Sequence, residues 1–154
     1  MATRGKGSVT FDYLAGFFDG EGSIFIAKIN NKRSGNIWYR LNLSCCNSNK
    51  EIMEEIHNRL SQTRKILLYR PPGKKSYKPS YQWLATGNVA LNALKILLPY
   101  LQVKKEQAKV GIAFQEWRNS LPRTGNKRDE KNTKQCEAYR MKLKILNGTA
   151  SRND

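Results

Sequence analysis

Two acidic side chains follow a short apolar stretch near the start of the chain, at a position where metal chemistry is expected. Asp19 and Glu21 lie within LAGFFDGEG, which runs from Leu14 to Gly22. The carboxyl end of a helix carries partial negative charge, so an ionised acid there is disfavoured unless a cation compensates. Among hard divalent cations, Mg²⁺ prefers one or two carboxylates together with phosphate oxygens and water. The pattern therefore suggests a magnesium site.

Helical periodicity places these acids at the end of an amphipathic helix. Thr10 is an N-cap candidate. Apolar residues follow at the spacing i, i+3, i+4 and i+7: Phe11, Leu14, Ala15 and Phe18. Gly20 and Gly22 are expected to end the helix. Because Gly16 and Gly20 lie one turn apart, a second backbone could approach that side closely, and the pattern predicts helix against helix.

A glycine-capped helix followed by a solvated acid is the simpler interpretation, and spacing alone favours it, since short acidic strings rich in glycine are common. The whole stretch, however, resembles the signature of the LAGLIDADG homing endonucleases. It matches at the leucine, the alanine, the two outer glycines and both acidic positions, with Glu21 in place of the second aspartate. A strand-rich pattern follows the motif, as it does in this family.

This resemblance implies an α+β fold of order α-ββ-α-ββ-α, in which two hairpins form a saddle-shaped antiparallel sheet over the DNA major groove. It covers about residues 9–108, a helical extension is expected over about 107–147, and residues 1–154 are predicted to form one domain. The motif occurs once, whereas family members that act as monomers carry two. The implied homodimer reads a long pseudo-palindromic site in double-stranded DNA. It packs two copies of the first helix through Leu14, Gly16, Phe17 and Gly20.

The resemblance also assigns roles to single residues. Glu21, helped by the Gly20 carbonyl oxygen, is the expected ligand of Mg²⁺, for which Mn²⁺ could substitute, and no small-molecule cofactor is expected. Lys104 matches a lysine that stabilises charge on the scissile phosphate or helps to activate water. Asn49 matches a polar residue that positions water, while Met53 replaces the basic residue usually found one helical turn later. The implied reaction is metal-dependent hydrolysis of both DNA strands.

Two alternatives use the same fold, namely an intron RNA maturase and a noncatalytic DNA-binding regulator. The retained Glu21, Gly20 and Lys104 favour the endonuclease, although a maturase could keep them too. A generic RNA-binding protein ranks last, because the chain has no RNP-like or KH-like string. Family habit suggests an intron-encoded protein of a chloroplast, a mitochondrion or a prokaryotic cytoplasm.

Charge is distributed as a polyanion-binding surface requires. The 154 residues include 28 Lys and Arg against 12 Asp and Glu, a formal net charge of +16. No acid occurs in residues 22–50 or 56–105, although basic residues occur in both segments. Both segments carry strand signals, which favours a basic sheet face over a uniformly basic protein kept soluble by its charge. The longest apolar run is far too short for a membrane helix, so a soluble intracellular protein is expected.

Cysteine and histidine usage disfavours zinc chemistry. Cys45, Cys46 and Cys136 form no CxxC pair, and His57 is the only histidine. An odd number of cysteines also argues against a disulfide framework. Zinc-dependent nucleases need several such ligands, so those classes do not fit.

The first acid-free segment predicts a hairpin with strands over 23–29 and 37–46. In the return strand polar residues alternate with apolar ones, and the polar set is expected to read base edges: Arg40, Asn42 and Ser44. The outgoing strand is apolar in both phases, so its DNA-facing side stays unassigned. Further DNA contacts are predicted from the remaining basic and polar positions of the sheet and its flanks: Lys28, Asn31, Lys32, Arg33, Arg70, Lys74, Lys75, Gln82 and Lys105.

Local signals define the remaining elements. A capping box of Ser48 and Glu51 predicts a helix, followed by a second hairpin over 65–70 and 80–85 in which Trp83 points inward. Asn88 is expected to cap a third helix that ends before Pro99. Two more helices are predicted over 107–119 and 135–146, joined by a polar loop, and are expected to support the core.

Overall fold

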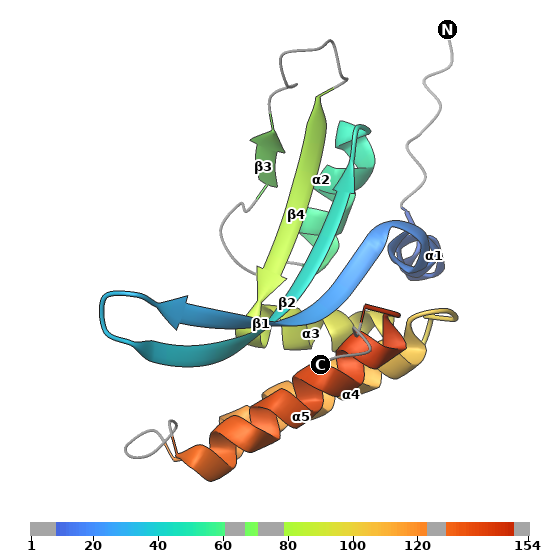
Figure 1. Cartoon of the computed structure of the whole chain (residues 1–154). Helices are drawn as coiled ribbons and strands as arrows, with labels where there is room; N and C mark the ends of the chain where they lie inside the picture. The colour runs from blue at the N-terminus through green and yellow to red at the C-terminus, as the bar shows by residue number, and fades with distance from the viewer. Residues whose placement is uncertain (1–8, 61–66, 71–78, 123–128, 150–154) are drawn as a thin grey trace, which may run out of the picture.

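The structure is a computed structural model that describes residues 9–60, 67–70, 79–122 and 129–149. The elements in these residues follow one another as α1 (Phe11–Glu21), β1 (Gly22–Asn31), β2 (Asn36–Asn47), α2 (Lys50–Leu60), β3 (Leu67–Arg70), β4 (Ser80–Thr86), α3 (Gly87–Leu97), α4 (Lys105–Ser120) and α5 (Glu130–Leu146) (Figure 1). The predicted α-ββ-α-ββ-α order, with further helices after it, is confirmed. Within the same residues, no helix has the length and apolar character needed to cross a membrane.

The strands form one antiparallel sheet in the order β1-β2-β4-β3. β1 and β2 pair along their whole shared length, from Gly22 opposite Cys45 to Asn31 opposite Asn36. β4 pairs with β2 only from Asn42 to its end. The outer half of the β1–β2 hairpin therefore projects beyond the rest of the sheet, as Figure 1 shows.

Side chains alternate between the two faces of this sheet. One face lies against the helices and contributes much of the hydrophobic core: Ile24, Ile26, Leu41, Leu43, Cys45, Trp83 and Ala85. The opposite face, called the open face below, is the more exposed and is built from Ser23, Phe25, Ala27, Ile29 and Asn31 of β1, Trp38, Arg40, Asn42, Ser44 and Cys46 of β2, and Gln82 and Leu84 of β4. The pairing register thus settles the phase of β1, which the apolar pattern leaves open, because directly paired residues share a face.

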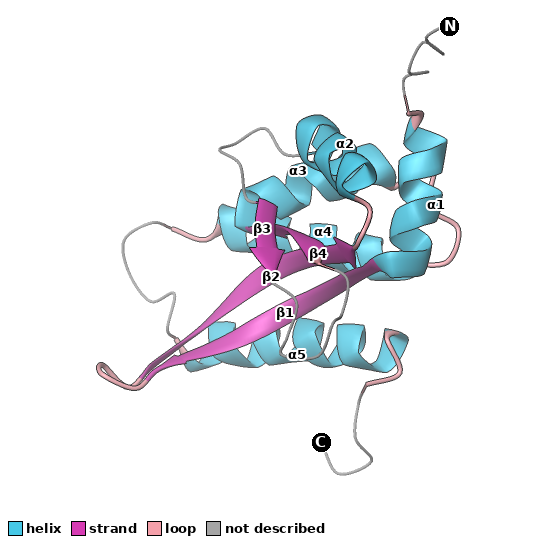
Figure 2. Cartoon of the chain, turned by 90° about the horizontal axis from the view of Figure 1, so that it is seen from above, coloured by secondary structure: helices cyan, strands magenta, loops and turns pink. Residues whose placement is uncertain are grey.

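The C-terminal helices hold the projecting hairpin from its core side. Glu137 of α5 accepts a hydrogen bond of 2.6 Å from the Tyr39 hydroxyl and pairs with Lys28 at 2.6 Å. Arg118 of α4 donates to the Tyr39 carbonyl oxygen at 3.0 Å. Figure 2 shows α5 running alongside the hairpin, in agreement with these contacts. The expectation that the helical extension supports the core is therefore confirmed for the described residues.

Two predicted helix starts need correction. The side-chain oxygen of Asn49 accepts from the Ile52 backbone N–H at 3.2 Å, so Asn49, and not Ser48, caps α2. The polar segment predicted as a loop after Pro122 is helical from Glu130 onward, because Asp129 caps α5 through the Lys131 N–H. Several residues near each of these helix starts can accept a hydrogen bond from a free backbone N–H, so local pattern alone could not choose the cap.

The start of α3 also differs from the prediction. Gly87 adopts φ of +58°, and α3 begins at this residue, which places Asn88 inside the first turn and not at the cap. The Asn88 side-chain oxygen accepts instead from Asn119 of α4 at 2.8 Å. A long-range hydrogen bond between helices has replaced the local one.

We expect Gly111→Ala to destabilise the fold. Gly111 lies where α4 crosses the core, and an added Cβ would lie 2.9 Å from Leu94 Cδ1 and 3.1 Å from Leu41 Cδ1. Helix propensity alone would make alanine stabilising by up to about 1 kcal/mol, but overpacking costs about 1–3 kcal/mol, so the net change should be destabilising. Urea denaturation followed by circular dichroism measures the difference. A variant that unfolds at higher urea concentration than the wild type would contradict this packing.

Candidate functional site

The acidic motif lies where α1 ends and β1 begins. Glu21 is the last residue of α1, and Gly22 opens β1 while donating its N–H to the Phe18 carbonyl oxygen. A Cβ at Gly22 would lie 2.4 Å from the Phe18 ring, so only glycine fits this turn. The Glu21 side chain is exposed at the negative end of the helix, as predicted. The helix continues through Gly20, whose expected role as a breaker is therefore corrected.

Asp19 braces this turn against the segment that leads into α4. Its two carboxylate oxygens accept from the backbone N–H groups of Gln102 at 2.8 Å and Lys104 at 2.9 Å. Burial opposes the charge on this carboxylate, but the backbone donors of Gln102, Lys104 and Val103 outweigh burial, so the pKa of Asp19 lies below its usual value. Asp19 thus anchors the motif, whereas Glu21 has no hydrogen bond or ion pair to any other described residue.

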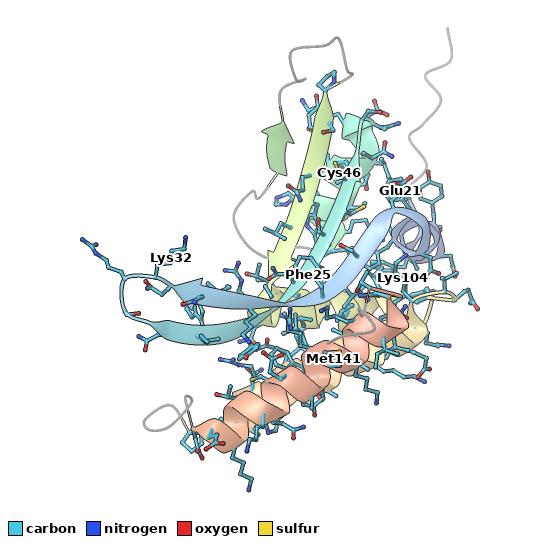
Figure 3. All side chains as sticks on the ribbon, viewed as in Figure 1. Glu21, Phe25, Lys32, Cys46, Lys104 and Met141 are labelled. Atoms are coloured by element: carbon cyan, nitrogen blue, oxygen red, sulfur yellow. The ribbon has the colours of Figure 1, made fainter. Side chains whose placement is uncertain are left out.

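Lys104 closes the same junction from the other side. Its ammonium donates to the backbone carbonyl oxygen of Asp19, near the negative end of α1. Burial raises the pKa of the Cys45 thiol to about 12, and the charges of Glu21 and Lys104 both act on that thiol. Cys45 pairs with Gly22, the residue that follows Glu21. Figure 3 shows Glu21 and Lys104 on the two sides of this junction.

The predicted water-positioning residue has a structural role. Asn49 uses its side-chain oxygen to cap α2, and it lines a cavity of about 330 Å³ with Tyr13, Glu51 and Glu54. No contact in the described residues connects Asn49 to Glu21. Met53 is completely buried in the core, so it supplies no polar group either.

The donor set at the end of α1 fits a hard divalent cation only in part. Within the described ranges, no three His, Cys, Asp or Glu side chains gather closely enough to hold a metal by themselves. One carboxylate, that of Glu21, and the adjacent Gly20 carbonyl oxygen are the oxygen donors that this chain offers. Mg²⁺ is satisfied by such a small protein contribution when phosphate oxygens and water complete its shell. The residues therefore fit Mg²⁺ bound together with a phosphate ligand.

The open face brings together three of the predicted base readers. Arg40 is exposed, and its Nε donates to the Asn42 side-chain oxygen at 3.1 Å. Asn42 is only 6% exposed, so it orients Arg40 more than it offers its own edge. Gln82 donates to the Ser44 hydroxyl at 3.1 Å, which links β4 to β2. Three exposed neighbours on this face were not among the predicted DNA contacts: Phe25, Trp38 and Cys46. Trp38 and Cys46 share the phase of Arg40 in β2, whereas the side of Phe25 follows only from the pairing register.

The remaining predicted DNA contacts are distributed unevenly. Asn31, Lys32 and Arg33 are exposed around the tip of the β1–β2 hairpin, and Lys105 is exposed at the start of α4. Lys28, also a predicted DNA contact, lies on the other face of β1 and pairs with Glu137. Two other groups are not described: Lys74 and Lys75 lie outside the described residues, and the Arg70 side chain is not placed although its strand is.

One side of α1 carries two glycines that no described residue covers. Gly16 and Gly20 are exposed, and a Cβ built on either would meet nothing within 4 Å. Tyr13, 56% exposed, and the half-buried Phe17 complete a stripe at the spacing i, i+3, i+4 and i+7. Leu14 is fully buried in the chain's own core, so its predicted place at a dimer interface is corrected.

The sequence matches the family described as LAGLIDADG endonuclease over residues 14–121. This span includes most of α1, the whole sheet and α4. No curated protein sequence matches the chain significantly.

Several solved structures resemble the fold. The homing endonuclease I-CvuI, in complex with an uncleaved DNA target in the presence of Mg²⁺, superposes with a TM-score of 0.67 at 21% identity, covering 88% of this chain and 80% of that one. The archaeal intron-encoded homing endonuclease I-Vdi141I, complexed with DNA, gives 0.63 at 16% identity, with 92% and 84% covered. The LAGLIDADG homing endonuclease I-GzeII, in complex with a DNA target, gives a TM-score of 0.65 at 18% identity. That match covers 87% of this chain but only 44% of the I-GzeII chain.

We expect Asp19→Asn to weaken the junction at neutral pH by about 2 kcal/mol, because an amide has one acceptor oxygen for several backbone donors. The folded-state pKa of Asp19 is lowered below 3.8. The stabilisation that charged Asp19 gives to the folded state is therefore fully present above the usual pKa of 3.8. It is lost as the pH falls through the lowered folded-state pKa, whereas asparagine does not titrate. The difference in free energy of unfolding between the two proteins should shrink below about pH 4.

Urea denaturation of both proteins between pH 7 and pH 3 makes this comparison. A difference that stays constant across the range would show that the Asp19 charge does not brace the junction.

Proposed function

Since the chain belongs to the LAGLIDADG endonuclease family, and so to a class of DNA endonucleases, we propose that it makes a Mg²⁺-dependent double-strand break at a long, pseudo-palindromic site. One observation supports this proposal. Gly20 and Glu21 end α1, and the Lys104 ammonium donates to the Asp19 carbonyl oxygen in the same last turn, where the open face of the sheet begins. A scissile phosphate placed there would meet an acid, a carbonyl oxygen and an ammonium group together.

Each residue has a distinct task in this proposal. Glu21 and the Gly20 carbonyl hold Mg²⁺, which when bound supplies polarisation of the phosphate and a more acidic water. Lys104 presents its ammonium to the negative charge that develops on the phosphate. Asp19 holds Lys104 and the end of α1 at a constant separation through the hydrogen bonds to the backbone of Gln102 and Lys104. Asn49 caps α2 through its Oδ1, and the Nδ2 donors of the same side chain would position water.

A homodimer is the assembly that we propose. The acidic motif occurs once in this chain. The chain spans 80% of I-CvuI but only 44% of I-GzeII, so the longer protein has room for a second unit of this size. The uncovered glycine stripe of α1 adjoins Glu21, and a two-fold axis through it would bring two acids to neighbouring phosphates.

The open face is the surface that we propose for DNA recognition. It carries Arg40 in a fixed orientation, and the hairpin tip adds Lys32 and Arg33. No acid occurs in residues 22–50, so β1 and β2 carry no negative charge that would repel a DNA phosphate. We further propose that the protein is intron-encoded and acts in the organelle or prokaryotic cell that hosts the intron, as the archaeal I-Vdi141I is described as intron-encoded.

We expect Glu21→Gln to abolish cleavage but to retain DNA binding. The change removes one negative charge and keeps the side-chain size, so the cleavage rate should fall by at least about a hundredfold. The measurement is sequencing of cut ends after incubation with a pool of long duplexes and Mg²⁺. Asp12→Asn, which changes an exposed acid in the first turn of the same helix, is the matched control and should cut normally.

Binding of the same proteins to labelled duplex DNA and to intron RNA, measured beside the cleavage, separates the alternatives. Equal cleavage by Glu21→Gln and the wild type would show that the Glu21 carboxylate takes no part in the reaction. Binding of duplex DNA without cutting by the wild type would favour a regulator, and preferential binding of intron RNA would favour a maturase.

We expect Gly16→Leu to dissociate the dimer without unfolding the chain. A Cβ at Gly16 meets no described residue within 4 Å, whereas a leucine there would hold two α1 helices apart. Sedimentation velocity should give twice 17.7 kDa for the wild type and a single chain for the variant. Ala113→Leu, at an exposed position of α4, is the control and should remain dimeric. A wild type that sediments as one chain would refute the proposed assembly.

A further inference from the structure

The open face of β1 is apolar over its central part. Phe25, Ala27 and Ile29 follow one another on this face, between Ser23 and Asn31 at the ends. None of the three can donate or accept a hydrogen bond through its side chain. A strand on a face that reads DNA by hydrogen bonds alone would not be built in this way.

The neighbouring strand extends this apolar surface. Ile29 pairs with Trp38 of β2, whose side chain is 58% exposed, and Phe25 pairs with Asn42 and is 38% exposed. Arg40 lies between these two positions along β2 and faces Ala27. The face therefore presents two apolar contacts, one on each side of a single oriented arginine.

The fold itself does not need these side chains. The core takes its apolar side chains from the opposite face of the same strands, including Ile24, Ile26 and Leu41. Neither Phe25 nor Trp38 belongs to the core or to the partly buried residues packed against it. Large apolar side chains left exposed in this way indicate a surface that is covered by something else.

The charges around this apolar surface indicate what kind of molecule binds to it. Arg40 lies within it, Lys32 and Arg33 flank it at the hairpin tip, and no acid occurs in residues 22–50. A negatively charged partner with exposed apolar groups fits this combination. In the major groove of duplex DNA, the group that meets this description is the 5-methyl group of thymine.

We propose that Phe25 and Trp38 read thymine by contact with its 5-methyl group, on either side of the base pair that faces Arg40. This inference rests on the proposed function, because it requires duplex DNA on the open face. Phe25 and Ile29 are four residues apart, which is about 13 Å along a strand and corresponds to about four base pairs. Each half of the target should therefore contain two thymines separated by about that distance.

Replacing thymine with deoxyuridine tests this, since the exchange removes only the methyl group. Sites are first selected by binding of the wild-type protein from a random duplex pool, with EDTA present so that no strand is cut. Each thymine of a selected site is then replaced singly, and affinity is measured by fluorescence anisotropy. We expect two positions per half-site at which uracil weakens binding about fourfold, and little change elsewhere.

Two serine variants show which side chain contacts which of the two thymines in a half-site. Phe25→Ser should erase the difference between thymine and uracil at the position nearer the scissile phosphate, and Trp38→Ser should erase it at the outer position. Ile145→Ser is the matched control, because Ile145 is 64% exposed on α5, the helix that contacts the other face of the hairpin. It should keep both differences. Since each ratio is taken within one variant, a general loss of affinity or stability cancels.

The outcomes separate this inference from the proposed function. Equal binding of thymine and uracil sites by a protein that still cuts the selected site would overturn the inference and leave the endonuclease proposal standing. Thymine preference that survives in both serine variants would overturn it as well. Failure of the wild type to select any duplex would overturn both proposals together.

Discussion

The junction between Asp19 and the segment before α4 is the constraint on which the rest of the site depends. Its carboxylate accepts from the backbone of Gln102 and Lys104, and the Lys104 ammonium returns to the Asp19 carbonyl oxygen. These contacts join residues more than eighty positions apart in sequence. They place one acid of the motif in a structural role, and they leave Glu21 exposed beside a lysine of fixed position. Without this junction the acid and the ammonium group would belong to independent segments.

The two faces of the sheet have different roles because side chains alternate along a strand. The face against the helices is filled by Trp83 and its aliphatic neighbours, and this packing fixes the register of β1 on β2. Once the register is fixed, the residues of the open face are fixed as well. The exposed Phe25 and Trp38 are therefore consequences of where Ile24 and Leu41 must pack. Core packing and recognition are linked through the pleat of the same strands.

The C-terminal helices explain how a long hairpin can project beyond its sheet. A two-stranded hairpin alone is marginally stable in water. Here Glu137 accepts from Tyr39 and Lys28, and Arg118 donates to the Tyr39 carbonyl, so α4 and α5 hold the hairpin at its middle. Burial would raise the pKa of Glu137, but its hydrogen bonds to Lys28 and Tyr39 lower it, so the carboxylate stays charged. The extension is thus part of the support for the open face.

The order of the elements and the acidic motif could be predicted from the sequence, since helical period, strand alternation and glycine positions are local properties. A resemblance that the family match confirms also indicated Glu21, Gly20 and Lys104. The partners of several other residues could not be predicted in this way. Asn49 caps a helix, Leu14 enters the core, Lys28 turns to α5, and the side of β1 that carries Phe25 is exposed. Each of these outcomes depends on hydrogen bonds or packing between segments far apart in the chain, and no local pattern contains that information.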